Sequence, residues 1–496
     1  MHLDETSSIP FYQQIFDDFR AGIESGAYPA HSKLPSIRGL ASDLGCSRNT
    51  IEAAYRLLVQ EGFAKSRPGS GYTVQDASFL QATPPSSHAQ TGGLLQEHLD
   101  SREAAAAAAA AKADASAGSA QGAGAARAAD APARFDFTYG NLQKGTFPAA
   151  SWRTITDDIL LSVERERADV YADPLGEHEL RTEISWRLCA LRGIKCTPEQ
   201  IVVQGGTQSS VQNLLTLFDG TTDVVAMDDP GYDGVRAVIE RNHFTVAPCR
   251  VMETPDAFMA DVDASGARLI YVTPSSQFPT CKHMPLDTRE RLIDWAAEHN
   301  AYILEDDYCR DFRYKDRPVP PLQSIDTRRR VIYMGTFSKS LSPALRMNYL
   351  VLPPELLERW REVFSGAYSA VPWLSQAVLA RFLSSGLWDR HLRRLQARNR
   401  RKYELLIDAL REHMGNKVEV MENGTGLHLL VNVPDGRTQP ELIAAARKAG
   451  VQIYGTEQYW IRKENALPGC VLVGFSAIEE DDIEPGVRAL AHAWFG

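Results

Sequence analysis

The 496-residue sequence contains no apolar run that approaches the ~20 residues of a membrane-spanning helix. Its first five residues are polar and acidic, so no secretory signal is expected there. Seven cysteines form no C-x-x-C pair, which argues against a zinc site and fits a reducing compartment. These absences indicate a cytoplasmic protein with no metal site and no membrane association. The length predicts two or more domains.

The segment 9–76 has the pattern of a winged helix-turn-helix. Apolar residues spaced three and four apart predict a first helix. Ser36 and Ser47 are N-cap signals for two further helices, and Gly45 makes the turn between them. The basic, glycine-rich stretch 63–74 then predicts a β-hairpin. An alternative is a small helical docking domain whose basic face is merely solvated.

Positive charge gathers in this segment although the chain carries a net charge of −10. Residues 31–72 contain six Lys or Arg and only three Asp or Glu. The start of a recognition helix contacts base edges, while cations elsewhere hold phosphates. The residues expected to meet DNA are Arg38, Ser47, Arg48, Thr50, Lys65, Arg67 and Gly69.

Two strings in this segment, LPSIRGLASDLGCSRNTIEAAYRLLVQEGF and SRPGSGYTV, resemble the winged helix-turn-helix of GntR-type bacterial regulators. The resemblance implies double-stranded operator DNA as a partner. The next stretch, 77–134, is rich in Ala, Gly, Ser and Pro and includes eight consecutive alanines. We interpret it as a linker without a core of its own.

Strand-like apolar runs alternate with helical patterns from 135 to 496. The runs are 200–203, 223–227, 268–272, 301–304 and 331–334. Such alternation predicts an α/β domain with a mostly parallel sheet covered by helices on both faces. Functional residues should then collect at the carboxyl ends of the strands.

Lys339 follows the last of these runs. A partly desolvated lysine is a good nucleophile and forms a Schiff base with a carbonyl compound. Thr336, Ser338 and Arg346 flank it and are the donors that a phosphate monoester needs. The combination suits pyridoxal 5′-phosphate (PLP), although a serine-lysine pair alone is usually just a surface lysine after a strand.

Further motifs follow the other strands directly. Gly206 and Thr207 open a helix, whose N-terminus is a ready phosphate site. Tyr232 adds an aromatic ring at the same edge. Three adjacent carboxylates, 305–307, repel one another, so at least one needs a cationic partner, and a pyridinium nitrogen would serve.

Together these motifs resemble a fold type I PLP-dependent aminotransferase over 135–496. The resemblance implies an internal aldimine at Lys339, a pyridine-nitrogen contact at Asp306, a ring-hydroxyl contact at Tyr308 and a stacking ring at Tyr232. The phosphate would be held by Gly206, Thr207, Thr336, Ser338 and Arg346, with Tyr171 lent to the neighbouring subunit's phosphate.

Two features depart from that resemblance. The family's Asn-Pro-Thr-Gly is replaced by 278–281, Phe-Pro-Thr-Cys. The strand-like run 471–476 lacks the arginine that clamps a substrate carboxylate, and Arg462 is the nearest substitute. Transamination is therefore expected to be weak or absent.

The GntR-type segment, linker and aminotransferase-like segment in one chain resemble the MocR-type transcription regulators. This resemblance implies a homodimer in which PLP, or its aldimine with an amine effector, sets the DNA-binding state. The effector would be a small amine, an amino acid or PLP itself. Two alternatives stay open: a working aminotransferase that also binds DNA, and a PLP-binding scaffold whose first segment docks protein.

Overall fold

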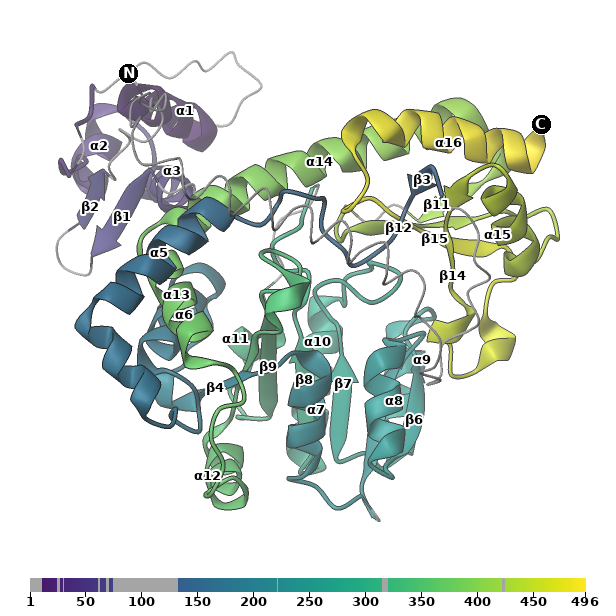
Figure 1. Ribbon diagram of the computed structural model, residues 1–496, viewed down its shortest axis with the longest axis horizontal. Helices are drawn as coiled ribbons and strands as arrows, with labels where there is room; N and C mark the ends of the chain where they lie inside the picture. The colour runs from purple at the N-terminus through teal and green to yellow at the C-terminus, as the bar shows by residue number, and fades with distance from the viewer. Residues whose placement is uncertain are drawn as a thin grey trace, which may run out of the picture. The chain divides into compact units, whose positions relative to one another are not determined.

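A computed structural model describes residues 11–24, 27–29, 31–60, 63–67, 71–74, 133–220, 222–314, 320–421 and 424–496 (Figure 1). We call the described part of 11–74 the head and the described part of 133–496 the body. Gly69, the side chains of Lys65 and Arg67, and nearly all of the expected linker 77–134 lie outside the described residues.

The head folds as three helices followed by a two-stranded hairpin. Its elements are α1 (Phe11–Glu24), α2 (Ile37–Asp43), α3 (Arg48–Gln60), β1 (Ala64–Arg67) and β2 (Gly71–Val74), with β1 and β2 antiparallel. The two expected N-caps are present: Ser36 Oγ accepts from the Gly39 N–H at 3.0 Å and Ser47 Oγ from the Thr50 N–H at 3.1 Å. Buried apolar residues such as Phe19, Tyr55 and Leu58 form its core.

The body is built on a seven-stranded sheet in the order β4-β10-β9-β8-β7-β5-β6. The strands are β4 (Ile201–Gln204), β5 (Val224–Asp229), β6 (Thr245–Arg250), β7 (Leu269–Val272), β8 (Tyr302–Asp306), β9 (Val331–Thr336) and β10 (Asn348–Val351). Neighbours from β9 to β6 are parallel, and β10 is antiparallel to both β9 and β4. The predicted mostly parallel sheet is confirmed.

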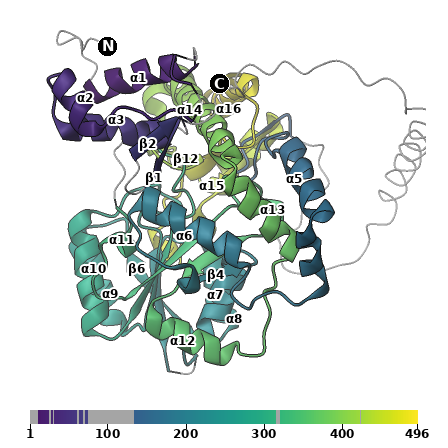
Figure 2. The ribbon, with the colours of Figure 1, turned by 90° about the vertical axis from the view of Figure 1, so that its left-hand side faces the viewer.

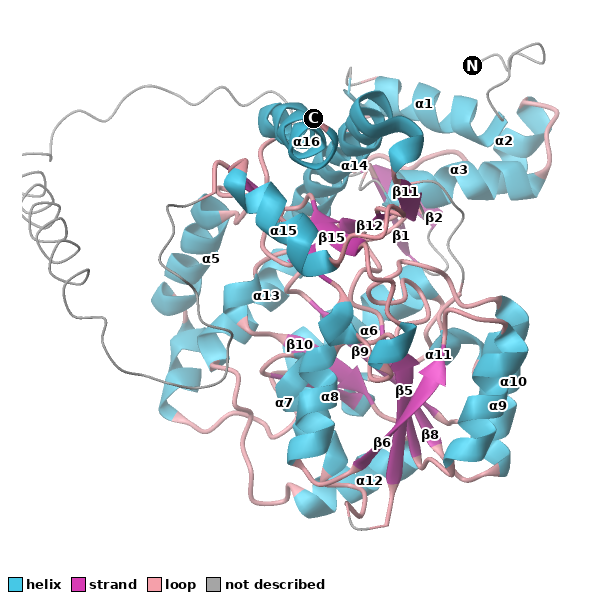
Figure 3. Cartoon of the chain, turned by 90° about the vertical axis from the view of Figure 1, so that its right-hand side faces the viewer, coloured by secondary structure: helices cyan, strands magenta, loops and turns pink. Residues whose placement is uncertain are grey.

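Helices cover both faces of this sheet, so its central strands are buried, with apolar residues along them and polar residues at the carboxyl ends of β5, β8 and β9. One face packs on α7 (Thr207–Leu215), α8 (Asp233–Arg241) and α12 (Pro354–Val363). The other packs on α9 (Pro255–Ser265), α10 (Leu286–Glu298) and α11 (Leu322–Ile325), and toward β4 on α5 (Ala149–Leu161), α6 (His178–Arg192) and α13 (Trp373–Ser384). Figures 2 and 3 show α7 and α8 on the opposite side of the strands from α9 and α10.

A second, smaller sheet has the order β11-β12-β15-β14. Its strands are β11 (Glu419–Met421), β12 (His428–Asn432), β14 (Tyr454–Gly455) and β15 (Cys470–Gly474). A short parallel pair, β3 (Phe135–Asp136) and β13 (Val451–Gln452), adds to this region. The long helix α14 (Leu387–Met414), with α15 (Gln439–Lys448) and α16 (Glu480–Phe495), packs in the same core.

Two strands of the large sheet have no counterpart among the predicted runs. β6 is an edge strand that contains Pro248, which weakens its signal because proline cannot donate to a sheet ladder. β10 was missed although it has four residues, as many as the predicted β4 and β7. Within the described residues, no helix combines the length and the apolar character needed to cross a bilayer.

Candidate functional site

The motifs that follow the parallel strands meet at one edge of the large sheet. Asp306 ends β8, Lys339 lies in the turn after β9, and Tyr232 precedes α8 after β5. Asp306 is close enough to Lys339 that each alters the pKa of the other. The parallel arrangement brings these residues together because all these strands end at the same edge.

Lys339 lies against the chain at 139–140. Its Nζ is 4.3 Å from the centroid of the Tyr139 ring, and a Cβ added to Gly140 would stand 3.1 Å from Nζ. Burial lowers the pKa of Lys339, and Cys309 and Asp306 oppose part of that effect. A larger fraction of its amine is therefore unprotonated at neutral pH, which is the form that attacks a carbonyl carbon.

Asp306 is buried and has one oxygen without a hydrogen-bond donor. Oδ2 accepts from the Tyr271 hydroxyl at 2.8 Å, whereas Oδ1 has no partner among the described residues. Burial raises the pKa of Asp306 to about 7, and Lys339 opposes the rise. A protonated ring nitrogen would supply the missing donor and a compensating positive charge, so the Asp306 carboxyl fits a pyridinium.

The carboxylates on either side of Asp306 have partners of their own. Asp307 accepts hydrogen bonds from Arg192 and from the Tyr333 hydroxyl. Glu305 accepts from the backbone N–H groups of Leu322 and Gln323 at 2.9 and 3.0 Å. Asp307 Oδ1, like Asp306 Oδ1, has no hydrogen-bond partner among the described residues, but Asp307 is paired with Arg192. Among the described residues, Asp306 is therefore the one of the three with neither an ion-pair partner nor a backbone N–H donor.

Arg346 and the Gly206 turn form the candidate phosphate site. Gly206 has φ +107°, and a Cβ there would stand 2.3 Å from an Arg346 guanidinium nitrogen, so only glycine leaves room for this arginine. The Gly206 N–H is already bonded to Asn348 Oδ1 at 3.0 Å. Gly206 thus contributes space and not a donor, which corrects that part of the expectation.

The other expected phosphate donors are Thr207, Thr336 and Ser338, and their roles stay predictions. Thr207 begins α7, and its N–H has no partner among the described residues. Thr336 ends β9, with its hydroxyl 3.1 Å from the Ser338 N–H. Asn348 was not predicted: its Oδ1 also accepts from the Ser210 hydroxyl at 3.0 Å and ties the turn after β4 to β10. In the sequence, the only indication of this role was that Asn348 is a polar residue at the start of an apolar run.

An aromatic cluster surrounds Phe278, at the position where asparagine is usual. Ring centroids of Tyr232, Tyr308 and Tyr459 lie 5.9, 6.2 and 4.8 Å from that of Phe278. Burial raises the pKa of Tyr308 well above its ordinary value, and its buried hydroxyl has no hydrogen bond of normal geometry among the described residues. Tyr308 therefore offers a neutral donor to a ligand.

No described residue of β15 is a cation. Leu472 lies fully buried in this strand and packs with Leu430 and Cys470. Arg462 is held elsewhere: one guanidinium nitrogen is 3.3 Å from the Pro248 carbonyl and another is 3.7 Å from Asp261. To bind a substrate carboxylate in place of the missing arginine, Arg462 would have to break these contacts.

Tyr171 lies on the body's surface. It is 80% exposed, and its ring stacks on Tyr368 with centroids 4.3 Å apart. It contributes nothing to this chain's own phosphate site, so the expectation that it serves a neighbouring subunit stays a prediction.

Among the expected DNA contacts whose side chains the structure describes, Arg38, Ser47 and Arg48 are exposed and Thr50 is partly buried. Arg38 lies on α2 and Arg48 on α3. The Ser47 and Thr50 hydroxyls lie 2.8 Å apart and bond to each other. Tyr55 OH donates to the Pro35 carbonyl at 2.9 Å, which fixes α3 against the segment that leads into α2.

Comparisons with known proteins agree with both regions. Residues 11–74 match the family "Bacterial regulatory proteins, gntR family", and 135–490 match "Aminotransferase class I and II". The uncharacterized HTH-type transcriptional regulator YhdI of Bacillus subtilis is 34% identical, over 99% of this chain and 97% of its own. The probable rhizopine catabolism regulatory protein MocR of Rhizobium meliloti is 30% identical, over 99% and 95%.

Other relatives extend this pattern. The HTH-type pyridoxine biosynthesis transcriptional regulator PdxR of Corynebacterium glutamicum is 25% identical over 97% of this chain and 94% of its own. Among solved structures, the α-aminoadipate aminotransferase LysN of Thermus thermophilus, complexed with N-(5′-phosphopyridoxyl)-L-leucine, has a TM-score of 0.65. It covers 72% of this chain and 91% of its own at 24% identity, which shows a shared fold.

Proposed function

The chain belongs to the MocR-type bacterial regulators, which join a GntR-type head to an aminotransferase-like body, and we propose that it is a DNA-binding transcription regulator whose body binds PLP and senses an amine. The observation that carries the proposal is Asp306: a buried carboxyl with an open oxygen, close to a nucleophilic lysine, in a chain that also has a winged helix-turn-helix. As a DNA-binding protein it would act in the cytoplasm.

The residues of the body divide the work of holding the cofactor. Lys339 would attack its aldehyde carbon, Asp306 would face the ring nitrogen, and Tyr308 would donate to the ring hydroxyl. Tyr232 would stack on the ring, and Arg346 with Thr207, Thr336 and Ser338 would bind the phosphate. When bound, PLP supplies an aldehyde that exchanges one amine for another and a ring that withdraws electrons.

Sensing follows from competition at the aldehyde carbon. An amine effector that takes the place of the Lys339 amine leaves Lys339 free beside Tyr139 and Gly140. Such an effector changes DNA binding only by its different affinity for two arrangements of the protein. The aromatic cluster around Phe278 and the apolar β15 favour an amine without an α-carboxylate, or PLP alone, over a common α-amino acid.

We also propose that the regulator is a homodimer. Leu161, Val170, Tyr171 and Tyr368 are between 56% and 84% exposed, and such exposed apolar side chains are costly in a monomer. Covering them with a second subunit would bring Tyr171 toward the partner's phosphate site. Sedimentation of the holo-protein, with Tyr171→Asp as a disruptive variant, tests this arrangement.

The test of the main proposal is salt-dependent binding of operator DNA by holo-protein with and without an amine. Arg48→Ala should lose specific binding by about 1–3 kcal/mol, because the exposed Arg48 starts the recognition helix. Lys65→Ala should weaken all sequences alike and flatten the salt slope. Equal wild-type affinity for operator and random DNA would contradict a sequence-reading head, and sustained turnover with an oxo acid would favour a working aminotransferase.

A further inference from the structure

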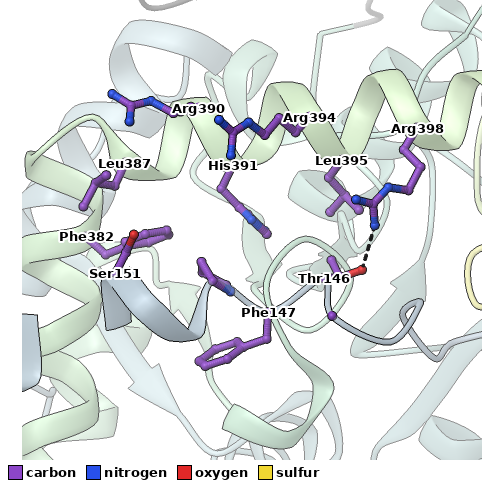
Figure 4. Close-up of a pocket in the computed structure, with 12 residues that line it drawn as sticks. Thr146, Phe147, Ser151, Phe382, Leu387, Arg390, His391, Arg394, Leu395 and Arg398 are labelled. Atoms are coloured by element: carbon purple, nitrogen blue, oxygen red, sulfur yellow. Dashed lines mark hydrogen bonds between the residues drawn. The ribbon is translucent and has the colours of Figure 1, made fainter. Parts of the chain in front are cut away.

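A cavity of about 230 Å³ lies in the body, apart from the candidate phosphate site. The first turns of α14 form one wall, and the end of α13 with residues 145–151 forms the others (Figure 4). Phe147, Phe382 and Leu387 make part of the lining apolar, while the α14 wall carries cations.

Three arginines line the cavity from the same face of α14. Arg390, Arg394 and Arg398 are four residues apart, a spacing that aligns side chains along a helix. His391 lies beside them, and none of the twelve described lining residues is acidic. Like charges one turn apart destabilise a helix, and cations in its first turns also oppose the macrodipole. The described lining therefore carries an excess of positive charge, which an anionic ligand would offset.

The electrostatics of two lining groups reflect this crowding. Burial and the neighbouring Arg394 lower the pKa of Arg390. Burial also lowers the pKa of His391, with Arg394 and Arg398 acting in the same direction, while the Ser340 carbonyl opposes them. An anion among these groups would relieve both effects.

Arg398 and Ser151 offer hydrogen bonds to such an anion. The Arg398 guanidinium is 3.3 Å from Thr146 Oγ1 and 3.4 Å from Gln143 Oε1, longer than the ~2.7–2.9 Å of a guanidinium bound to an oxyanion. Ser151 adds a hydroxyl from α5 on the opposite wall. These donors come from α14 and α5, two elements of one compact body.

We propose that this cavity binds a small phosphate monoester as a second ligand. A phosphate monoester has two negative charges and several acceptor oxygens, which more than one guanidinium can share. The cavity's volume suits a small molecule, and its apolar wall would meet the organic part. The inference goes beyond the proposed function and does not rest on it, because binding here can be measured without DNA or amine.

The cavity is also connected to the lysine. His391 Nε2 is 2.7 Å from the carbonyl oxygen of Ser340, the residue after Lys339. The lining loop at 145–148 follows Tyr139 and Gly140, which lie against Lys339 Nζ. A ligand that fixes these groups would therefore affect two segments next to Lys339: the turn at Ser340 and the chain at Tyr139 and Gly140.

Calorimetric titration of holo-protein with glycerol 3-phosphate, and with glycerol as the phosphate-free control, tests the proposal. The double variant Arg390→Gln/Arg394→Gln should bind glycerol 3-phosphate about tenfold more weakly or worse. The matched control is Arg401→Gln/Arg411→Gln, which also removes two arginines from α14 but away from the cavity, next to Glu480 and Asp408. It should bind as the wild type does.

A second variant separates a lost site from a damaged fold. Ser151→Glu places a carboxylate among the arginines and in the first turn of α5, where the helix dipole favours it. It should raise the melting temperature and abolish glycerol 3-phosphate binding, whereas Ser151→Ala should retain most of it.

Three results would overturn the assignment. The first is no measurable binding by the wild type, and the second is equal loss in the cavity and control double variants. The third is a short random DNA duplex that binds in dependence on Arg390 and Arg394 while glycerol 3-phosphate does not, because the phosphates would then come from nucleic acid.

Discussion

The two ends of the candidate cofactor site differ in the charged groups they present. At the lysine and phosphate end, Asp306 lies close to Lys339, Tyr232 is near both Asp306 and Arg346, and Gly206 is kept small to admit the arginine. At the β15 end, Leu472 is packed in an apolar cluster and Arg462 is bonded away from the site. The first end would suit a phosphorylated ring under the proposed function, whereas no described residue of β15 offers a cation to an α-carboxylate.

This difference separates binding a cofactor from catalysing with it. Holding PLP needs partners for its aldehyde, nitrogen and phosphate, all of which the first end can supply. Rapid proton removal from an amino acid also needs the substrate held in one orientation, which a bidentate arginine normally provides. A body that retains the first set without the second is suited to sensing more than to turnover.

The largest effect on cofactor binding is expected from removing Lys339. In Lys339→Ala, the cofactor fixed to protein by borohydride reduction should fall to background, because the nucleophilic amine is gone. Peptide mass mapping after reduction measures this directly. Lys282→Ala removes a lysine from the loop next to Cys281 and should keep full labelling. An adduct that persists at another lysine in Lys339→Ala would show that the site is misplaced.

Gly206→Ala tests the phosphate end with a single methyl group. The added Cβ would stand 2.3 Å from the Arg346 guanidinium at a backbone φ of +107°, so the arginine must move. Cofactor affinity should fall about tenfold to hundredfold. Gly205→Ala is the matched control, because its Cβ would meet only Ser209 at 3.7 Å without a positive φ. Equal affinities of the two variants, measured by titrating apo-protein with PLP, would contradict the role of Gly206.

Asp306→Asn tests the lysine end of the site through the pH dependence of protein stability. Burial raises the pKa of Asp306 to about 7, above the ~3.9 of an unfolded aspartate. The folded apo-protein therefore prefers the protonated form, and this contribution to stability is lost as the pH rises from about 4 to about 7. The asparagine variant has no such loss. Over this pH range, the free energy of unfolding of the wild-type apo-protein should therefore decrease by about 1–4 kcal/mol relative to that of the variant.

Melting temperatures of both apo-proteins at pH 5 and pH 8 measure the effect. PLP should reverse it at pH 8, since a ring nitrogen that bonds the ionised carboxylate stabilises the wild type only. Parallel melting curves at the two pH values would mean that Asp306 is not held in the buried state described.

Sequence reasoning anticipated the proximity of residues whose positions follow from local order along the chain, while their roles stay predictions. Lys339, Asp306 and Tyr232 each come directly after a strand, and a parallel sheet gathers such residues without any need to know the packing. The buried strand before Lys339 was recognised because it is apolar and β-branched. Caps at Ser36 and Ser47 were equally local, since each bonds a backbone N–H three residues on.

What sequence reasoning missed depends on contacts between distant segments. Asn348 meets the Gly206 N–H across 142 positions, and Arg192 meets Asp307 across 115. Tyr139 lies on Lys339 only because the chain returns there from its parallel pairing at β3. The Gly206 amide was assigned to phosphate for the same reason: its partner on β10 could not be seen from the helix N-terminus alone.

The smallest expected effect concerns Arg462, the possible substitute for the missing clamp. Its guanidinium contacts the Pro248 carbonyl and Asp261, while its own N–H and that of Ile461 bond Asp229 at 3.1 and 2.7 Å. Backbone anchoring on both residues keeps this segment in place, so swinging the side chain into the site would sacrifice existing contacts. Arg462→Ala should therefore change the response of holo-protein absorbance to α-amino acids by less than about twofold, equivalent to roughly 0.4 kcal/mol. Asp261→Asn, which removes the ionic partner, should likewise recruit no clamp.

If α-amino acids convert the wild type rapidly and Arg462→Ala abolishes the conversion, the arginine does swing in, and the β15 end is complete after all. If conversion is rapid in both proteins, the carboxylate is held by a group other than Arg462, and the contrast between the two ends of the site fails.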